Sequence, residues 1–229
     1  MRISRILAIA GIGSALLLGS LAVPASAAVF PTRINVVQGI PGKTLDVCID
    51  NKEVRSKAKY GSVTKADVVA GTHTIKLKKV APGRCKGKTL RKFTFVIPDG
   101  IDATVVATHK SPSKWMLYYN PQSTSVDTSY YSFTNAADIG KVGITALFGG
   151  FTPSESAWIW QKGERRVPLT TNAGNTLHYA ALKIGGSRFL GGQRVQNFAA
   201  GKHYDFILLG TSKKNTRWAR VARKIQQVV

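Results

Sequence analysis

The sequence predicts an all-β protein with two tandem β-sandwich domains that follow a cleaved signal peptide. Three observations predict it: short apolar or alternating runs separated by turn residues, two distant segments that follow the same plan, and a basic, then apolar, N-terminus. We expect a signal peptide over 1–27, a first domain over 28–122, a linker over 123–137 and a second domain over 138–229.

The N-terminus has the pattern of an export signal. Arg2 and Arg5 precede an apolar stretch over 6–23, and Pro24 then leads into the Ala-Ser-Ala sequence at 25–27. This order is typical of a signal peptide that is cut after the last alanine. A transmembrane anchor is the alternative, because the stretch is near the lower length for crossing a bilayer. Its glycines and serines favour cleavage, and no later segment is long and apolar enough to span. We therefore expect a secreted protein, extracellular or associated with the cell surface.

The rest of the chain is predicted as short strands. Pro-Gly, Asp-Asn and Ala-Gly pairs separate the apolar runs, and such residues end one strand before the next begins. In the first domain the runs lie at 32–37, 45–49, 66–69, 73–77, 90–97, 103–108 and 115–119. In the second domain they lie at 142–148, 157–161, 177–183, 195–199, 203–209 and 218–222. About seven short strands with regular turns favour a sandwich in each domain.

Two segments repeat one plan: strand, Gly turn, strand, basic polar loop, and a strand that begins with Trp. In both copies this Trp follows a Thr at the same distance, 115 − 108 = 7 and 218 − 211 = 7. A duplicated unit of this size indicates two similar domains. For the chain end a basic amphipathic helix is the alternative, since Trp218, Val221, Ile225 and Val228 fall at helical spacing. The repeat favours a final strand.

The segment between the domains is predicted as a linker. Residues 121–139 contain no Lys or Arg. Tyr130, Tyr131 and Phe133 make it too apolar for a free linker, so we expect part of it to pack between the domains.

Both cysteines lie in the first domain and are expected to form a disulfide. Cys48 lies between Asp46 and Asp50 on the outward face of an alternating strand, and Cys85 lies in a basic Pro-Gly loop. A Cys48–Cys85 bond would fold this loop over the acidic strand face. Two free thiols or a redox pair are the alternative, but no Cys-x-x-Cys motif is present, and an isolated pair in an exported protein is typically bonded.

The chain is strongly basic. Without residues 1–27 it carries 33 − 2 = 31 Lys+Arg against 11 Asp+Glu, or +20. This excess favours polyanionic partners, namely an anionic envelope polymer, a glycan or nucleic acid; a charge that only keeps the protein soluble is the alternative. Two clusters contain no acid. The first is Lys76, Lys78, Lys79, Arg84, Lys86, Lys88, Arg91 and Lys92; the second is Lys213, Lys214, Arg217, Arg220, Arg223 and Lys224.

No recognisable catalytic or metal-binding set is present. The histidines are His73, His109, His178 and His203, with no pair at metal-ligand spacing and no cysteine beside them. His73 alternates in phase with apolar neighbours, which favours a buried and hydrogen-bonded side chain. There is no Gly-x-Ser-x-Gly elbow and no phosphate-binding loop. We expect no catalytic residue, no metal ligand and no cofactor.

Several strand and turn motifs have a counterpart in a known family. They are Leu45-Asp46-Val47-Cys48-Ile49-Asp50-Asn51-Lys52, Val69-Ala70-Gly71-Thr72-His73-Thr74-Ile75-Lys76, Gly140-Lys141-Val142-Gly143-Ile144-Thr145 and Ala199-Ala200-Gly201-Lys202-His203-Tyr204. These segments resemble the bacterial family called "domain of unknown function 4397", whose members are typically exported and often duplicated. The resemblance implies two tandem immunoglobulin-like sandwiches, and no catalytic residue carries over from it.

The expected function is that of an exported, non-enzymatic binding or structural module that contacts anionic polymers through the first basic cluster. The alternative is an exported hydrolase or other enzyme with an unrecognised site. The two differ in where the site lies, because an enzyme uses a deep polar cleft and a binding module more often uses a face or loop tips.

Overall fold

The computed structural model describes residues 31–109, 115–120, 128–139, 141–148, 158–160, 169–184, 189–212 and 214–224. The predicted signal peptide over 1–27 lies outside this range. The described residues form sixteen strands and no helix, so the prediction of an all-β chain is confirmed. In particular, this part of the chain has no helix with the length and apolarity that crossing a membrane requires.

The first half, residues 31–120, forms two four-stranded sheets. The sheet on the side away from the second half, here called the outer sheet, has the order β3-β2-β5-β6. The inner sheet, which faces the second half, has the order β4-β1-β7-β8. Neighbouring strands are antiparallel except β1 and β7, which are parallel. The strands are β1 (Arg33–Gln38), β2 (Thr44–Ile49), β3 (Lys52–Lys59), β4 (Val63–Asp67), β5 (Gly71–Lys79), β6 (Thr89–Ile97), β7 (Asp102–Ala107) and β8 (Trp115–Asn120).

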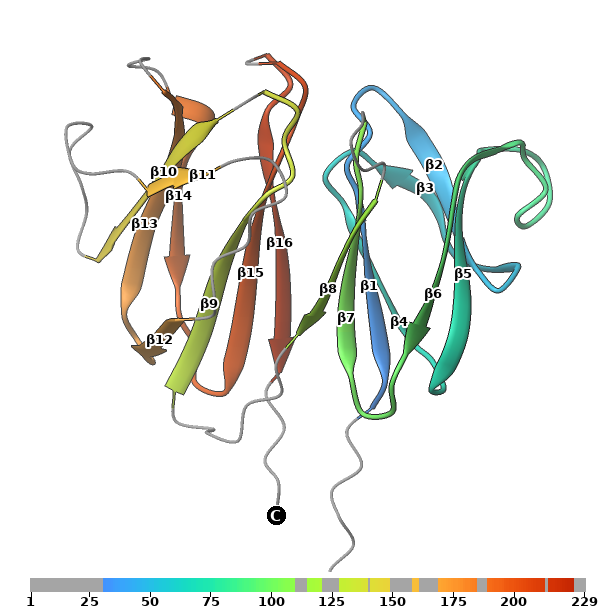
Figure 1. Cartoon of the computed structure of the whole chain (residues 1–229), viewed down its shortest axis with the longest axis horizontal. Helices are drawn as coiled ribbons and strands as arrows, with labels where there is room; N and C mark the ends of the chain where they lie inside the picture. Colours follow the sequence, from blue (N-terminus) through green and yellow to red (C-terminus); the bar gives the residue numbers. More distant parts are fainter. Residues whose placement is uncertain are drawn as a thin grey trace, which may run out of the picture.

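The second half, residues 128–224, has the same strand order with eight added to each number. Its inner sheet is β12-β9-β15-β16, its outer sheet is β11-β10-β13-β14, and β9 and β15 are parallel. The strands are β9 (Thr128–Asn135), β10 (Val142–Phe148), β11 (Trp158–Trp160), β12 (Leu169–Asn172), β13 (Thr176–Lys183), β14 (Phe189–Asn197), β15 (Lys202–Leu209) and β16 (Arg217–Lys224). The four sheets stand side by side as four layers (Figure 1).

The predicted linker over 123–137 is wrong over β9. This strand is central in its sheet and pairs with β12 and β15. It contains no Lys or Arg because most of its side chains are buried between two layers, not because it is a solvated connection. Strands β3 and β12 were also not predicted, and the strand expected at 66–69 ends at Asp67 instead. Val69, whose apolar side chain suggested a strand, lies in the following turn and is 78% exposed.

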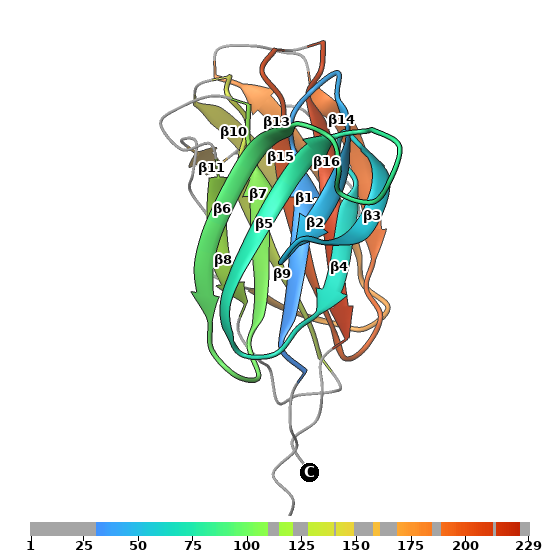
Figure 2. The ribbon, with the colours of Figure 1, turned by 90° about the vertical axis from the view of Figure 1, so that its right-hand side faces the viewer.

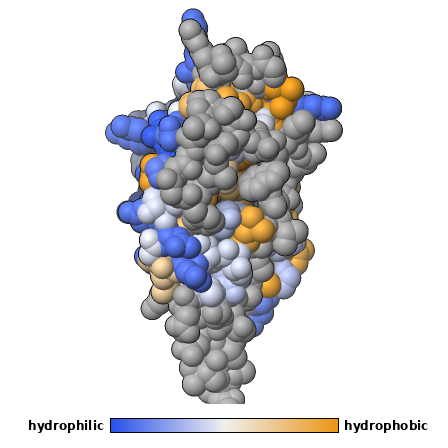
Figure 3. Space-filling model, turned by 90° about the vertical axis from the view of Figure 1, so that its left-hand side faces the viewer, coloured by the Kyte–Doolittle hydropathy of each residue, from blue (hydrophilic) through white to orange (hydrophobic). Residues whose placement is uncertain are grey.

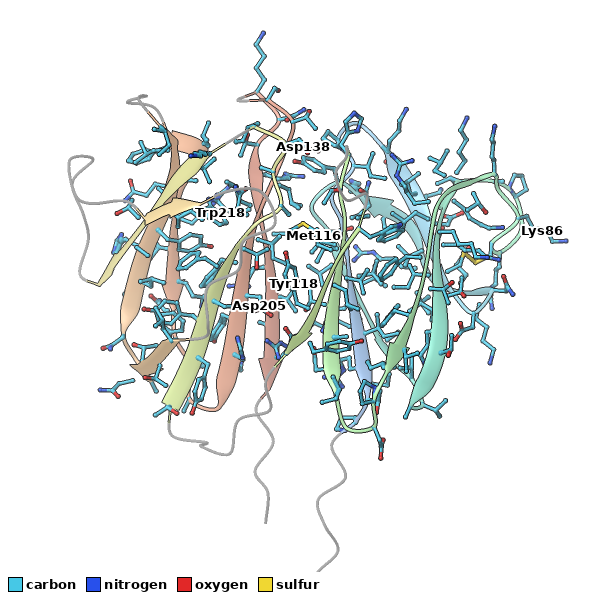
Figure 4. The ribbon with its side chains drawn as sticks, viewed as in Figure 1. Lys86, Met116, Tyr118, Asp138, Asp205 and Trp218 are labelled. Carbon is cyan, nitrogen blue, oxygen red and sulfur yellow. A yellow bond between two sulfur atoms is a disulfide. The ribbon has the colours of Figure 1, made fainter. Side chains whose placement is uncertain are left out.

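Residues 217–224 form a strand, as the repeat predicts for 218–222, and not an amphipathic helix. Strand β16 pairs with β15 along its whole length. Trp218 at its start points into the second half, where its ring meets those of Phe133 and Tyr179 at centroid distances of 6.0 and 5.1 Å (Figure 4). The aromatic contact therefore fixes the side of the strand that faces this core.

Alternation along the inner strands directs residues to two different cores. In β1, Ile34 and Val36 face the core between the two sheets of the first half, whereas Val37 belongs to a separate cluster. In β15, Phe206 faces the core of the second half and Ile207 that separate cluster. Both faces of the inner strands are therefore apolar, which explains near-continuous burial in β1, β7 and β15.

The separate cluster is a third core that joins the two halves. It is formed by the inner sheets, and its buried members are Val37, Val106, Met116, Ala136, Ile207, Leu209, Ala219 and Val221. Met116 and Tyr118 of β8 lie between the inner sheets in Figure 4. Burial of this apolar surface favours one four-layer body over two independent sandwiches, at roughly 25 cal/mol per Å² removed from water.

A buried polar network lies beside the third core. Asp102 accepts hydrogen bonds from the side-chain amides of Asn35 and Asn120 at 2.6 and 2.7 Å. On the facing sheet, Arg223 Nη2 donates to Asp205 at 2.8 Å, and Arg223 Nε lies 3.8 Å from Asp102 Oδ1. Burial raises the pKa of Asp102, because the loss of water outweighs the charge of Arg223 and the hydrogen bond from Asn120. One guanidinium thus compensates two carboxylates from different halves.

A second group of contacts joins the halves at the end of β3. The Tyr60 hydroxyl donates to the Asn215 carbonyl at 2.7 Å, and Arg217 Nη1 donates to the Tyr60 carbonyl at 2.6 Å. The Arg217 guanidinium also lies 5.2 Å from the centre of the Tyr60 ring, within the range of a cation–π contact. These bonds fix the rotation of one half against the other.

Replacing Arg223 by Met should destabilise the protein by about 3–5 kcal/mol at pH 7, because it leaves two buried carboxylates without their cation. The loss should shrink at pH 5, since protonation of a carboxyl with a raised pKa removes its buried charge. Urea unfolding at both pH values measures it. Lys202→Met, at an exposed position of β15, is the control and should change stability by less than about 0.5 kcal/mol. An equal loss of stability in Arg223→Met and Lys202→Met would contradict the role of Arg223 in the network.

Candidate anion-binding surface

All eight residues of the first basic cluster lie on one hairpin at the outer sheet of the first half. Strand β5 carries Lys76, Lys78 and Lys79, and strand β6 carries Arg91 and Lys92. The remaining three, Arg84, Lys86 and Lys88, lie in the connection over 80–88. Figure 2 looks onto this sheet, with the connection across its upper part, and Figure 4 shows Lys86 at the outer edge, away from the second half.

The connection over 80–88 is tied to the sheet by the predicted disulfide. Cys48 and Cys85 are bonded, with their Cα atoms 6.2 Å apart, which confirms this prediction. Cys48 lies on β2, whose alternation points its side chain away from the core. The bond therefore holds the connection over the outer face of β2.

Three further contacts hold the connection in place. The Cys85 N–H donates to Glu53 Oε2 at 3.4 Å, and its carbonyl accepts a hydrogen bond from Lys78 Nζ at 2.5 Å. Gly87 packs so closely that a Cβ atom there would lie 1.7 Å from the Lys79 carbonyl oxygen, so glycine is required. The exposed Arg84, Lys86 and Lys88 are thus carried by an anchored loop.

Beside the loop, β5 and β6 present an open face. The cross-strand pairs on it are Thr72 with Val96, Thr74 with Thr94, and Lys76 with Lys92. The Thr74 and Thr94 hydroxyl oxygens lie 2.9 Å apart. This face, together with the loop beside it, forms what we call the basic ledge: Lys76, Lys78, Lys92, Arg84, Lys86 and Lys88, with Thr74 and Thr94.

Not all residues of the first basic cluster lie on the open face of β5 and β6. Arg91 faces the other side of β6, where its guanidinium donates to the carbonyls of Leu90 and His109 at 3.0 and 3.3 Å. Lys76 Nζ donates to the side chain of Asn51 at 2.7 Å. Within the described residues, none of the eight cations forms an ion pair with a carboxylate.

The two acidic residues that were expected to face the loop are largely occupied. Asp46 is 1% exposed and accepts the Lys57 N–H at 2.9 Å. Asp50 lies in the turn after β2 and not on the strand face, and both Asp50 and Asn51 have positive φ, as a two-residue hairpin of type I′ requires. Its carboxylate binds the Thr74 N–H at 2.8 Å and is directed to His73.

His73 is buried and fully hydrogen-bonded, as its alternation predicts. Its Nδ1 lies 2.6 Å from Asp50 Oδ2 and its Nε2 lies 2.7 Å from the Val69 carbonyl. Because a carboxylate and a carbonyl both accept, this geometry suits a ring that donates from both nitrogens, which is the imidazolium form. Burial would lower the pKa of His73, but the hydrogen bonds and the charge of Asp50 outweigh it and raise that pKa. Burial also opposes ionisation of Asp50, yet the Thr74 and His73 bonds lower the pKa of Asp50.

The edge strand β3 adds cations that the sequence prediction missed. Lys52, Arg55, Lys57 and Lys59 are exposed on it. Over residues 43–92 the chain carries 14 Lys+Arg and 4 Asp+Glu, and 14 − 4 = +10, which is half of the +20 expected for the chain without its signal peptide. Lysines also protect an edge strand from pairing with another chain, so β3 has this second role. The dense spacing of cations at 52–59 could have indicated from the sequence that this segment adds to the basic surface.

The second basic cluster is dispersed. Arg223 is buried in the network between the halves, Arg217 contacts Tyr60, and Arg220 donates to the side chain of Gln196. Lys213 lies outside the described residues. These three arginines thus hold the second half and its contact with the first.

Three residues of a catalytic type meet between the halves, but their order is not that of a triad. Ser132 donates its hydroxyl to Asp205, and His203 Nε2 lies 3.4 Å from the same carboxylate oxygen. A nucleophilic triad needs the histidine between serine and acid. All three side chains are buried. Among the residues that the structure describes, no three His, Cys, Asp or Glu side chains come together as a metal site requires.

The opposite side of the molecule has a different surface. There the coloured part of the outer sheet of the second half shows hydrophilic side chains next to separate hydrophobic ones (Figure 3). The exposed apolar residues of this half include Ile184 and Val195.

No family model matches the chain, and no curated protein matches its sequence. The resemblance to the bacterial family named above therefore stays a prediction.

Replacing Cys48 and Cys85 together by Ala should lower the free energy of unfolding by about 4 kcal/mol. The reason is the loop entropy that a bond across 37 residues removes from the unfolded chain. Guanidinium unfolding of the variant and of the oxidised parent measures the difference. A parent reduced before unfolding should behave as the variant does. A cost below about 1 kcal/mol would contradict the prediction.

The His73–Asp50 pair should give stability a defined pH dependence. For His73 the contribution is complete below the unfolded-state pKa of 6.5 and is lost as pH rises through the raised folded pKa. For Asp50 it is complete above 3.8 and is lost as pH falls through the lowered folded pKa. Unfolding measured from pH 5 to 9 should show that the parent loses more stability above pH 6.5 than His73→Phe. Parallel curves would contradict this assignment.

Proposed function

We propose that this protein is an exported, non-enzymatic binding module of the cell surface or extracellular space, which contacts anionic polymers through its basic ledge. The observation that carries the proposal is the ledge itself: exposed cations on an anchored loop beside a lysine-bearing sheet face, with no carboxylate paired to them among the described residues. Such a group is favourable beside a polyanion, where it replaces counterions.

Two features support export. The first 27 residues have the order of a signal peptide, and disulfides persist mainly in oxidising compartments. The equal strand order of the halves and the parallel contact of the first and seventh strands of each half support a tandem duplication of immunoglobulin-like sandwiches. The resemblance to the bacterial family points in the same direction.

The side chains of the ledge favour a polymer read by charge. The cross-strand neighbours on the open face are Thr, Lys and Val. The aromatic side chains of β6, Phe93 and Phe95, pack against the first-half core, as does Trp115. Tyr119 is exposed, but it lies on β8 of the inner sheet and not on the open face of β5 and β6. Stacking on exposed aromatic rings supplies much of the affinity of single-strand nucleic-acid binders. A polymer without bases therefore fits this surface better than single-stranded DNA or RNA.

Heparin and inorganic polyphosphate are suitable probes of this function, measured by titration calorimetry at 50 and 200 mM salt. Binding should weaken steeply over this range, because each neutralised charge releases counterions. Replacing Arg84, Lys86, Lys88 and Lys92 together by Gln should reduce the slope of log affinity against log salt by up to about 3, at roughly 0.7 for each lost contact.

A variant with the same loss of charge is the control. Lys141, Arg194, Lys202 and Lys214 are exposed in the second half, and replacing these four by Gln should leave the affinity and the slope close to those of the parent. Equal weakening in the two variants would reduce the charge to a general property of the molecule. No salt-dependent binding in the parent would reject the function.

A further inference from the structure

One pair of residues on the basic ledge places two positive charges opposite each other, which destabilises the sheet. Lys76 and Lys92 are direct cross-strand partners on the open face of β5 and β6. Like charges directly opposite each other destabilise a sheet. Lys76 donates to a neutral amide oxygen of Asn51, and Lys92 is exposed, so no carboxylate among the described residues offsets the repulsion. An anion placed between the two ammonium groups would remove it.

The neighbouring pair supplies a neutral donor. The Thr74 and Thr94 hydroxyls lie 2.9 Å apart, and either can donate to the other. One proton is used between them, so the other hydroxyl retains a proton for a third group. Along both strands these residues are two positions from the lysines, or about 7 Å. The donors therefore come from two ammonium groups and one hydroxyl on a single face.

The anchored loop borders this face. Lys76 is the cross-strand neighbour of Cys48, and Cys48 is bonded to Cys85 of the loop. Lys78, the next outward residue of β5, binds the Cys85 carbonyl. The disulfide thus places the cations of the loop beside the lysine pair, which limits the ordering that binding requires.

We infer that the Lys76–Lys92 pair, with the Thr74–Thr94 hydroxyls, binds the phosphate or sulfate groups of a polymer. A tetrahedral oxyanion presents several oxygens in different directions and can meet both ammonium groups and a hydroxyl at once. A carboxylate presents two oxygens in one plane, which matches the fork of an arginine better than two separate lysines. This inference rests on the proposed function and names the group that the ledge recognises.

The decisive variant is Lys92→Glu. It turns a like-charge pair into a cross-strand ion pair, so without ligand it should raise the melting temperature by roughly 1–4 °C. It should also weaken the binding of inorganic polyphosphate and dextran sulfate at least tenfold. Lys86→Glu makes the same change of charge at an exposed loop position that lies outside the paired residues of β5 and β6. It should leave the melting temperature unchanged and weaken binding clearly less.

A second variant tests the type of anion. Replacing Thr74 and Thr94 together by Val removes both hydroxyls and keeps the shape and strand preference of the side chains. It should weaken polyphosphate and dextran sulfate binding several-fold and leave the binding of polygalacturonate, a carboxylate polymer, unchanged.

The possible results distinguish failure of the proposed function from failure of the lysine-pair site. If the parent binds none of the polymers, the proposed function fails. If the parent binds but Lys92→Glu and Lys86→Glu weaken binding equally, the function stands and the lysine-pair site is overturned. If polygalacturonate binding falls with the threonine variant as much as polyphosphate binding does, the preference for a tetrahedral group is overturned. A higher melting temperature with a specific loss of polyphosphate and dextran sulfate binding would support the site.

Discussion

Both faces of the two inner sheets are buried, and this determines where charge can lie in the molecule. One face of each inner sheet packs on its own outer sheet, and the other packs on the facing inner sheet through Val37, Val106, Ile207 and their neighbours. Charged groups enter this region only as a compensated network, in which Arg223 lies between Asp102 and Asp205. For the described strands of the first half, the broad sheet face left to solvent is therefore the outer face of β3-β2-β5-β6.

The disulfide turns this solvent face into an organised surface. Without it, the connection between β5 and β6 would be a basic loop whose ordering costs free energy on binding. The Cys48–Cys85 bond, the Lys78 contact and the close packing of Gly87 hold it against the sheet. Asp46, on the same strand as Cys48, is buried and accepts the Lys57 N–H, and it forms no ion pair with the described lysines. The loop that the disulfide holds in place is therefore the loop that carries Arg84, Lys86 and Lys88.

The parts of this arrangement that depend on local pattern could be predicted from the sequence, and those that depend on packing between distant segments could not. Alternation and turn residues indicated the apolar strands, and the Trp218 repeat separated a final strand from a helix. Strand β9 resembles a linker in sequence because one of its faces carries polar residues such as Ser132 and Thr134, which are buried only by the packing of distant segments. Strand β3 was missed because an edge strand rich in lysine lacks an apolar pattern. The cross-strand register that places Lys76 opposite Lys92 follows from pairing, and the position of the cluster in the sequence does not give it.

The most direct test of the account is a map of lysine protection on the parent protein. Surface lysines are acetylated with and without saturating inorganic polyphosphate at 50 mM salt, and the modified sites are quantified by mass spectrometry. Strong protection is expected at Lys76, Lys86, Lys88 and Lys92, and little at the exposed Lys202 and Lys214 of the second half. Protection that is uniform over both halves, or concentrated at Lys202 and Lys214, would contradict it.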